Sequence, residues 1–304
     1  MRILLTNDDG ILAPGILALH DALVDARGEF GGPLGELLWP VAPLTVQSAT
    51  SHGVTFHTPL MVSEESIDGR MSGLAVDGRP ADCVKLAICS LWPEQFGQGQ
   101  RPDLVISGMN AGANVGINVI YSGTVAAALE AAFLGVPSIA VSLHLGKGKA
   151  RFDLAARRAR NAIEALIAGG IGAEGALRPH DCISINIPRT EQALGSGERA
   201  DTPHYELEPV WAKGLSAPVP AEDMPPLRVC PMNTHALVDA YERRTSPSGQ
   251  RYYWAAGSGL NFLEADEGTD VDLLFRGNVT VTPLRYDLTE RDELDRWRQQ
   301  LGVE

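Results

Sequence analysis

The sequence predicts an α/β protein with a doubly wound, mostly parallel sheet and an appended C-terminal region. Two observations carry this prediction. From residue 2 to about residue 188, short apolar runs alternate with segments whose apolar residues recur at helical spacing. After residue 188 this alternation stops, and 189–226 are rich in Pro, Gly and charge. We therefore divide the chain into a core, residues 1–188, and an extension, residues 189–304, that packs on the core.

The first half of the core, up to residue 108, is predicted to contain alternating strands and helices. Arg2–Thr6 is a short apolar run, and residues 13–26 form a helix in which Ile16, Leu19 and Leu23 share one side and Pro14 lies in the first turn. The next predicted elements are a strand at 36–43, an extended segment at 54–62 with a hairpin partner at 70–78, a helix at 81–92 and a strand at 103–108.

The second half of the core begins at residue 107 with a Gly- and Asn-rich loop. A helix follows Ser122, and a Gly-Val-Pro break at 135–137 precedes the next strand. One apolar stripe is predicted on this helix: Val125, Ala128, Leu129, Ala132 and Phe133. A further helix at 152–167 and a strand at 182–188 complete the core, with Phe152, Ala159, Ile163 and Leu166 on one side of that helix.

The extension has short extended pieces at 251–256 and 278–284 and then a terminal helix within 288–301. Thr289 is the predicted N-cap, and Asp292 is in the reciprocal position of a capping box. Leu294, Trp297 and Leu301 form an apolar edge. An apolar edge on a terminal helix predicts docking, either on the chain's own core or on a partner subunit.

Composition excludes several classes of protein. The chain has 304 residues, 44% hydrophobic and 21% charged, with a net charge of −13 and no long Lys/Arg cluster, so double-stranded nucleic acid is not an expected partner. We find no signal peptide and no apolar run long enough to cross a membrane, and we expect a cytoplasmic protein. The four cysteines lack zinc-binding spacing, which predicts reduced and mostly buried thiols.

Two adjacent carboxylates, Asp8 and Asp9, follow the first strand. They therefore lie at its carboxyl end, where open α/β sheets bind their ligands. Like charges this close repel each other unless a cation neutralises them, and Mg²⁺ or Mn²⁺ prefers such hard oxygen ligands. The segment "NDDG" is also typical turn sequence. From these four residues alone, a turn and a metal site are both open.

Two further candidates lie in the segment from residue 107. Asn110 and Asn114 can supply amide oxygens to a metal or hydrogen bonds to a phosphoryl group, although a glycine-rich turn explains them equally. Ser122, Gly123 and Thr124 open a helix whose N-terminus suits an anion, although simple N-capping explains them as well.

A third polar loop follows the strand at 36–43 and contains Ser48, Thr50, Ser51 and His52. A single histidine is more often a hydrogen-bonded surface residue than a general base. The three loops together favour a functional site over simple turns and caps, because all three lie at the carboxyl ends of strands and carry oxygen ligands or anion-binding features. The sequence has no phosphate-binding G-x-x-x-x-G-K-[ST] loop, no G-x-G-x-x-G dinucleotide fingerprint between a strand and a helix, and no G-x-S-x-G. Hydrolysis of a phosphate ester fits best.

These segments resemble the SurE family, the stationary-phase survival nucleotidases. The resemblance rests on "MRILLTNDDGILAPGI", on "VAP" followed four residues later by Ser48, and above all on "SGMNAGANVGINVIYSGTVAAALEA". It is continuous to about residue 188, through "RPADCVKLA", "PDLVISG", "GVPSIAVS" and "INIP", and resumes at "YYW" and "GNVTVTPLRYDLT".

The resemblance implies a Rossmann-like three-layer core with a C-terminal extension, and dimers or tetramers formed through exchanged C-terminal elements. It implies one divalent ion, Mg²⁺ or Mn²⁺, held by Asp8, Asp9, Ser48 and Asn110. It further implies that Asn114 and Ser122 bind and stabilise the phosphoryl group, within the same turn as Gly123 and Thr124. The implied substrates are nucleoside 5′- and 3′-monophosphates.

The chain also departs from the family pattern in two places. Leu44–Gln47 replaces a charged or polar stretch, and Ile117–Asn118 replaces an acidic pair.

From the three loops and the resemblance together, we expect a metal-dependent phosphomonoesterase acting on nucleoside monophosphates, by attack of water or of one aspartate. The competing hypotheses are a nucleotide-binding paralogue with weak or lost phosphatase activity and an oligomeric scaffold.

Overall fold

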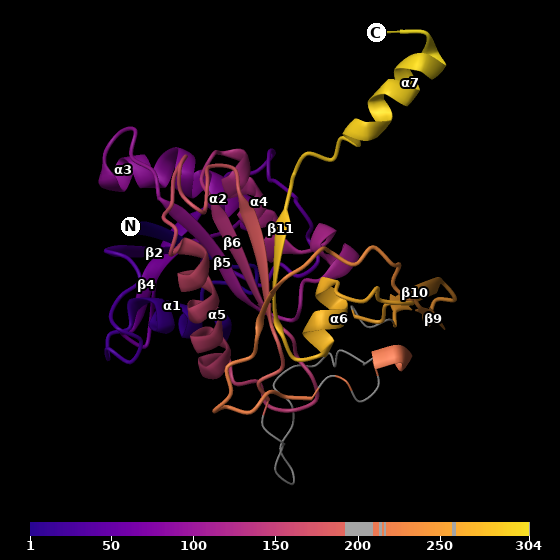
Figure 1. Cartoon of the computed structure of the whole chain (residues 1–304), viewed down its shortest axis with the longest axis horizontal. Coiled ribbons are helices and arrows are strands. Elements are labelled where there is room, and N and C mark those ends of the chain that lie inside the picture. Colours follow the sequence, from indigo (N-terminus) through magenta and orange to yellow (C-terminus); the bar gives the residue numbers. More distant parts are fainter. Residues whose placement is uncertain (192–208, 213–214, 216, 257–259, 304) are drawn as a thin grey trace.

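The computed structural model describes residues 1–191, 209–212, 215, 217–256 and 260–303 (Figure 1). A nine-stranded sheet runs through the molecule in the order β3-β4-β2-β1-β5-β6-β7-β11-β8. Its strands are β1 Arg2–Thr6, β2 Leu37–Pro43, β3 Val62–Ile67, β4 Met71–Val76, β5 Leu104–Ala111, β6 Ser138–Leu143, β7 Cys182–Ile187, β8 Leu227–Val229 and β11 Val279–Leu284.

The centre of the sheet is parallel and is covered on both faces by helices. Strands β4, β2, β1, β5, β6 and β7 pair in parallel with their neighbours. Helices α1 (Pro14–Val24) and α5 (Phe152–Ile167) pack together in the core of one face, and α2 (Pro80–Leu86) packs against α4 (Gly123–Phe133) in the core of the other. The predicted α/β class and its helix–sheet–helix layers are confirmed.

The hairpin partner predicted at 70–78 is present as β4, but the strand that it pairs with is β3, which begins at Val62, where the predicted extended segment 54–62 ends. Strand β3 pairs antiparallel with β4, from Val62 opposite Val76 to Ile67 opposite Met71. The sequence "VSEESI" has too few apolar residues to indicate a strand. This composition suits β3, because the strand lies at the edge of the sheet and is largely exposed. The turn at Asp68 and Gly69, both in the left-handed region at φ 51° and 66°, fixes the register instead.

Helix α4 is buried on nearly every side, which differs from the predicted single stripe. Of the five predicted positions, Phe133 is the one that is exposed, at 43%, and Ala126, Ala127 and Ala131, outside that stripe, are buried. Small side chains allow this, because an alanine-rich helix can approach the sheet and α2 closely. The helix predicted at 81–92 is also longer, since a π-turn at Ala87–Leu91 joins α2 to α3 (Trp92–Phe96).

Part of the C-terminal region belongs to the sheet. Strand β11 pairs antiparallel with β7 and parallel with β8. The remaining elements are a separate antiparallel hairpin, β9 (Tyr241–Thr245) with β10 (Arg251–Ala255), and a short helix, α6 (Asp270–Phe275). The division at residue 188 stays a prediction.

Helix α7 (Leu294–Leu301) extends away from the sheet and ends next to the C-terminus (Figure 1). Its predicted cap is wrong. A 3₁₀ turn at Arg291–Glu293 precedes the helix, and the Thr289 N–H donates to Asp287 Oδ1 at 3.0 Å. The Asp287 side chain therefore closes a turn where the sequence predicts a capping box. The predicted apolar edge exists and is exposed at Leu294, Trp297 and Leu301.

Two further predictions concern thiols and membranes. All four cysteines are free, and three of them, Cys83, Cys182 and Cys230, are buried, while Cys89 is exposed. Within the described residues, none of the helices has the length and apolar character needed to cross a membrane. The cytoplasmic location stays a prediction.

Candidate active site

Asp8 lies two residues after the end of β1 and is enclosed by the start of α4. Its side chain is 6% exposed, and its Oδ1 accepts a hydrogen bond from the Thr124 hydroxyl at 2.5 Å. A Cβ atom on Gly123 would lie 2.9 Å from Asp8 Oδ2, so a residue with a side chain does not fit at this position without displacing the carboxylate. The backbone of the first turn of α4 therefore packs directly against the Asp8 carboxylate, and Gly123 is required there because it has no side chain.

The two aspartates form a site that favours a cation. Burial and the neighbouring charge of Asp9 raise the pKa of Asp8 to about 7. Burial also raises the pKa of Asp9, although the Ala111 N–H, which donates to Asp9 Oδ2 at 2.9 Å, opposes the shift. A nearby cation would stabilise the ionised form of both carboxylates against burial and against their mutual repulsion, so the pair fits a divalent ion. Among the described residues no group of three or more His, Cys, Asp or Glu side chains could hold one. Neutral oxygens of amides and hydroxyls are also ligands for hard cations.

Asn110 and Asn114 come from the end of β5, where the pairing with β6 shifts register between Ser107 and Asn110. The Asn110 Nδ2 donates to the Gly112 carbonyl at 2.7 Å, which leaves Oδ1 as the atom suited to a metal. The Asn114 Nδ2 donates to Ser142 Oγ at 2.8 Å. The neighbouring strand β6 thus holds the Asn114 amide.

The remaining residues of the α4 turn have local partners. Ser122 caps α4, because its Oγ accepts from the Val125 N–H at 3.1 Å. Thr124 is fully buried, and both its hydroxyl and its backbone N–H bond to Asp8. Thr124 therefore contacts Asp8 directly, whereas the sequence predicts contact with substrate. The substrate roles of Ser122, Gly123 and Thr124 stay predictions.

The Ser48 loop, residues 44–56, is hydrogen-bonded to the other two loops. The Gln47 N–H donates to the Asp8 carbonyl at 2.8 Å. The Ser51 N–H donates to the Tyr121 carbonyl at 3.1 Å, and the Ser51 hydroxyl donates to the Ile120 carbonyl at 2.7 Å. Ser48 itself is exposed, one residue after the bond to Asp8. All three predicted loops therefore meet at one edge of the sheet.

Sequence reasoning missed Glu130, which lies in α4 and is 3% exposed. It contacts His52 of the Ser48 loop at 2.8 Å and Lys85 of α2 at 3.0 Å. The available signal was one acidic residue within an alanine-rich helix, in the stretch "AAALEAAF". A buried carboxylate in such a helix needs partners from other elements.

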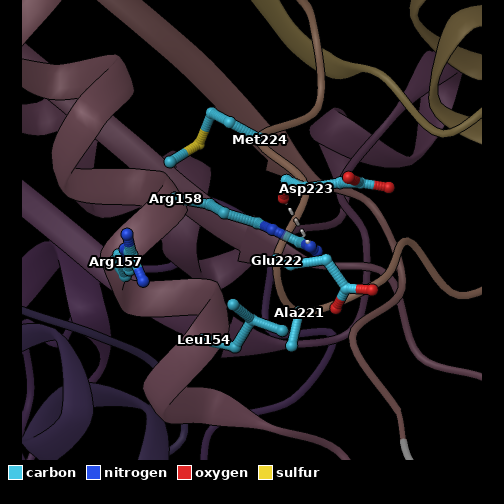
Figure 2. A pocket seen from close by; sticks show the side chains of 7 residues that line it. All are labelled: Leu154, Arg157, Arg158, Ala221, Glu222, Asp223 and Met224. Atoms are coloured by element: carbon cyan, nitrogen blue, oxygen red, sulfur yellow. Dashed lines mark hydrogen bonds between the residues drawn. The ribbon is translucent and has the colours of Figure 1, made fainter.

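A small cavity of about 60 Å³ lies outside this group of residues (Figure 2). Its lining contains Leu154, Arg157 and Arg158 of α5 and residues 221–224, including Glu222 and Asp223. The Arg158 Nη2 donates to the carbonyls of Val219, Pro220 and Asp223 at 3.1, 2.6 and 3.1 Å. Arg158 thus ties α5 to the segment after residue 218, and the lining mixes both signs of charge.

Comparisons with known proteins place this arrangement in one family. A family model described as "Survival protein SurE" matches residues 3–202. A protein of Heliobacterium modesticaldum named 5′-nucleotidase SurE is 37% identical over 303 residues, covering 99% of this chain and 92% of that protein. A protein of the same name from Rhodopirellula baltica is 40% identical over 295 residues, covering 97% and 96%. The crystal structure of the SurE protein from Aquifex aeolicus superposes with a TM-score of 0.70 at 30% identity, covering 99% of this chain and 100% of that one.

Proposed function

The chain belongs to the SurE family, and we propose that it is a metal-dependent 5′-nucleotidase that releases phosphate from nucleoside monophosphates. One observation supports the metal-dependent part of this proposal. Asp8 is a nearly buried carboxylate beside Asp9, at an edge where the Gln47 N–H donates to the Asp8 carbonyl and the Ala111 N–H donates to Asp9 Oδ2. Such a pair is stabilised by a cation and is poorly suited to a site without one.

Asp8, Asp9, Ser48 and Asn110 would hold the ion, with Mg²⁺ or Mn²⁺ as the expected metals. When bound, the ion would polarise the phosphoryl group and activate water. Thr124 fixes the orientation of Asp8 through its hydroxyl. In this way the buried side of the carboxylate is already hydrogen-bonded before any ligand arrives.

Asn114 and Ser122 would contact the phosphoryl oxygens. The Ser122 Oγ accepts from Val125, so its hydroxyl hydrogen can still donate. Asn114 uses one hydrogen of its amide group on Ser142 and keeps a second. Because both side chains are already held by the protein, their donors would be pre-oriented toward the charge that develops on the transferred group.

Phosphate release from AMP tests the enzymatic proposal. We expect release with Mn²⁺ or Mg²⁺, little without metal, and a loss of at least a thousandfold in Asp8→Asn, with Asp239→Asn, an exposed acidic position, as the matched control. Parallel assays with Co²⁺ and with 3′-AMP define metal preference and the proposed 3′ activity. Nucleotide binding without phosphate release would contradict the enzyme and support the binding paralogue.

The identity of the nucleophile needs a separate experiment. Attack by water and attack by an aspartate oxygen are both compatible with the residues present. We expect direct attack by water, so that single-turnover reactions with radiolabelled nucleotide leave no acid-trapped label on the protein. A trapped aspartyl phosphate would rule out direct attack.

We further propose a homo-oligomer, a dimer or tetramer, formed through the C-terminal elements. The support is a set of exposed apolar side chains in two C-terminal elements: Tyr252, Tyr253 and Trp254 of β10, and Leu294, Trp297 and Leu301 of α7. Light scattering of the full chain should give a mass at least twice 32.5 kDa. A monomer at high concentration would contradict this proposal and leave the enzymatic one intact.

A further inference from the structure

Glu130 is a buried carboxylate with two partners, and the proposed function gives no role to any of the three residues. Its Oε2 lies 2.8 Å from Nε2 of His52, and its Oε1 accepts from Lys85 Nζ at 3.0 Å. Glu130 is 3% exposed and belongs to α4, the helix whose first turn encloses Asp8. The carboxylate therefore lies on the same rigid element as the site but away from its reacting groups.

The charge state of Glu130 fixes the direction of its hydrogen bonds. Burial favours the neutral acid, but hydrogen bonds from His52 and Lys85 outweigh burial and hold the pKa of Glu130 below its ordinary value. An ionised carboxylate can only accept hydrogen bonds, so Nε2 of His52 carries the hydrogen and donates it. Such a charge-assisted bond is stronger and more directional than a neutral one.

His52 belongs to the Ser48 loop and is held by α4 in two ways. Besides the bond to Glu130, its ring stacks on Phe133 with a centroid distance of 4.9 Å and an interplanar angle of 7°. On the other side of Ser48, the Gln47 N–H donates to the Asp8 carbonyl at 2.8 Å. Ser48 is therefore an exposed residue between two anchored positions of the loop, residues 47 and 52.

We propose that Glu130 and His52 are positioning residues, whose hydrogen bond holds the Ser48 loop so that the Ser48 hydroxyl stays beside the Asp8–Asp9 carboxylates. The inference rests on the proposed function, because it assigns Ser48 to the divalent ion. Residues that orient metal ligands typically change metal affinity or activity by about 10- to 100-fold when they are replaced. Lys85 bonds to the same carboxylate from α2, outside the loop, and so provides a matched control.

The variants separate the hydrogen bond from the packing. His52→Phe keeps a ring that can stack on Phe133 but removes the donor to Glu130. Glu130→Gln keeps one oxygen for Lys85 and offers an amide to the histidine ring, so it retains part of the interaction. Lys85→Gln removes the other donor to Glu130 and changes no residue of the loop.

The measurement is Mn²⁺ binding to the full chain in the absence of nucleotide, followed by the electron paramagnetic resonance signal of free Mn²⁺ and by calorimetry. We expect His52→Phe to weaken Mn²⁺ binding about tenfold or more, Glu130→Gln to weaken it less, and Lys85→Gln to change it less than twofold. Hydrogen exchange at the Ser51 amide should speed up in His52→Phe and not in Lys85→Gln, while the melting temperature without metal should fall in both variants, because each removes one of the two donors to Glu130.

Two results would overturn the inference while leaving the proposed function in place. One is wild-type Mn²⁺ affinity in His52→Phe, and the other is an equal loss of affinity in Lys85→Gln, because Lys85 is not part of the loop. If the wild-type chain itself neither binds Mn²⁺ nor releases phosphate, then the proposed function fails, and this inference fails with it.

Discussion

The sheet with its flanking helices and the C-terminal elements β9–β10 and α7 differ in where their apolar side chains lie. In α4, nine of eleven residues are buried, and even Glu130 is enclosed. In α7 no residue is buried, although its apolar edge contains Leu294, Trp297 and Leu301. A helix of eight residues is too short to be stable by itself in water. The core therefore holds the site by its own packing, whereas α7 leaves its apolar edge uncovered.

The largest expected effect comes from the tightest contact in the core. Gly123→Val would place side-chain atoms where Asp8 lies, since even a Cβ would be 2.8 Å from Asp8 Cβ. We expect phosphate release from AMP to fall at least a thousandfold, because the carboxylate must move. A Gly302→Ala variant at the exposed end of α7 serves as the control and should keep full activity. Near-normal turnover in Gly123→Val would show that the core is less rigid than the packing indicates.

Acid should weaken the core through a buried histidine. Burial, together with the nearby charge of Arg70, lowers the pKa of His20 to about 4 in the folded state, against 6.5 ordinarily. Below pH 6.5 the unfolded chain binds a proton that the folded chain excludes, so stability is complete above pH 6.5 and is lost as the pH falls toward 4. At 1.36 kcal/mol per pKa unit, the loss is about 3 kcal/mol.

Urea unfolding between pH 7 and pH 4 tests this expectation. The pH-dependent loss of unfolding free energy should be smaller in His20→Gln than in the wild type, even if the variant is less stable at pH 7. Replacing the half-buried His235, which contacts Asp266 at 3.0 Å, should not reduce the loss in the same way. An unchanged acid profile in His20→Gln would assign the effect to other groups.

A smaller effect is expected from the hydroxyl that orients Asp8. Thr124→Val keeps the shape of the side chain but removes its hydrogen bond to Asp8 Oδ1. We expect a fall in kcat for AMP of about tenfold, as for other residues that orient metal ligands. Stability should fall by about 1 kcal/mol, the usual net value of one hydrogen bond. If KM alone rises, Thr124 contacts substrate directly, as the sequence predicts.

The smallest effect is expected in α7. Trp297 is 51% exposed, so Trp297→Ala should change the unfolding free energy of the dilute chain by less than about 0.5 kcal/mol. The same variant should lower the mass that light scattering measures at high protein concentration. A large loss of stability at low concentration would mean that α7 packs on its own core, and the contrast between the two regions would disappear.

The sequence indicates the parts of the structure that depend on local pattern. The alternation of apolar runs predicts β1, β5, β6 and β7 and the helices between them, because strand and helix periods differ. It fails for β3, whose polar side chains face solvent and whose register comes from a turn. It also fails for the start of α7, because a capping pattern does not reveal that Asp287 already binds the Thr289 N–H.

For the candidate site, the sequence by itself determined which residue types are present and that they follow strands. Asp8, Asp9, Asn110, Ser122 and Ser48 could be named in this way because parallel strands deliver their loops to one edge. Only the tertiary structure decided which of these groups touch one another. It turned Thr124 toward Asp8, and it joined Glu130 to His52 across 78 positions of the chain. Such contacts depend on how α4 packs against the sheet, and local sequence patterns do not predict contacts between residues so far apart along the chain.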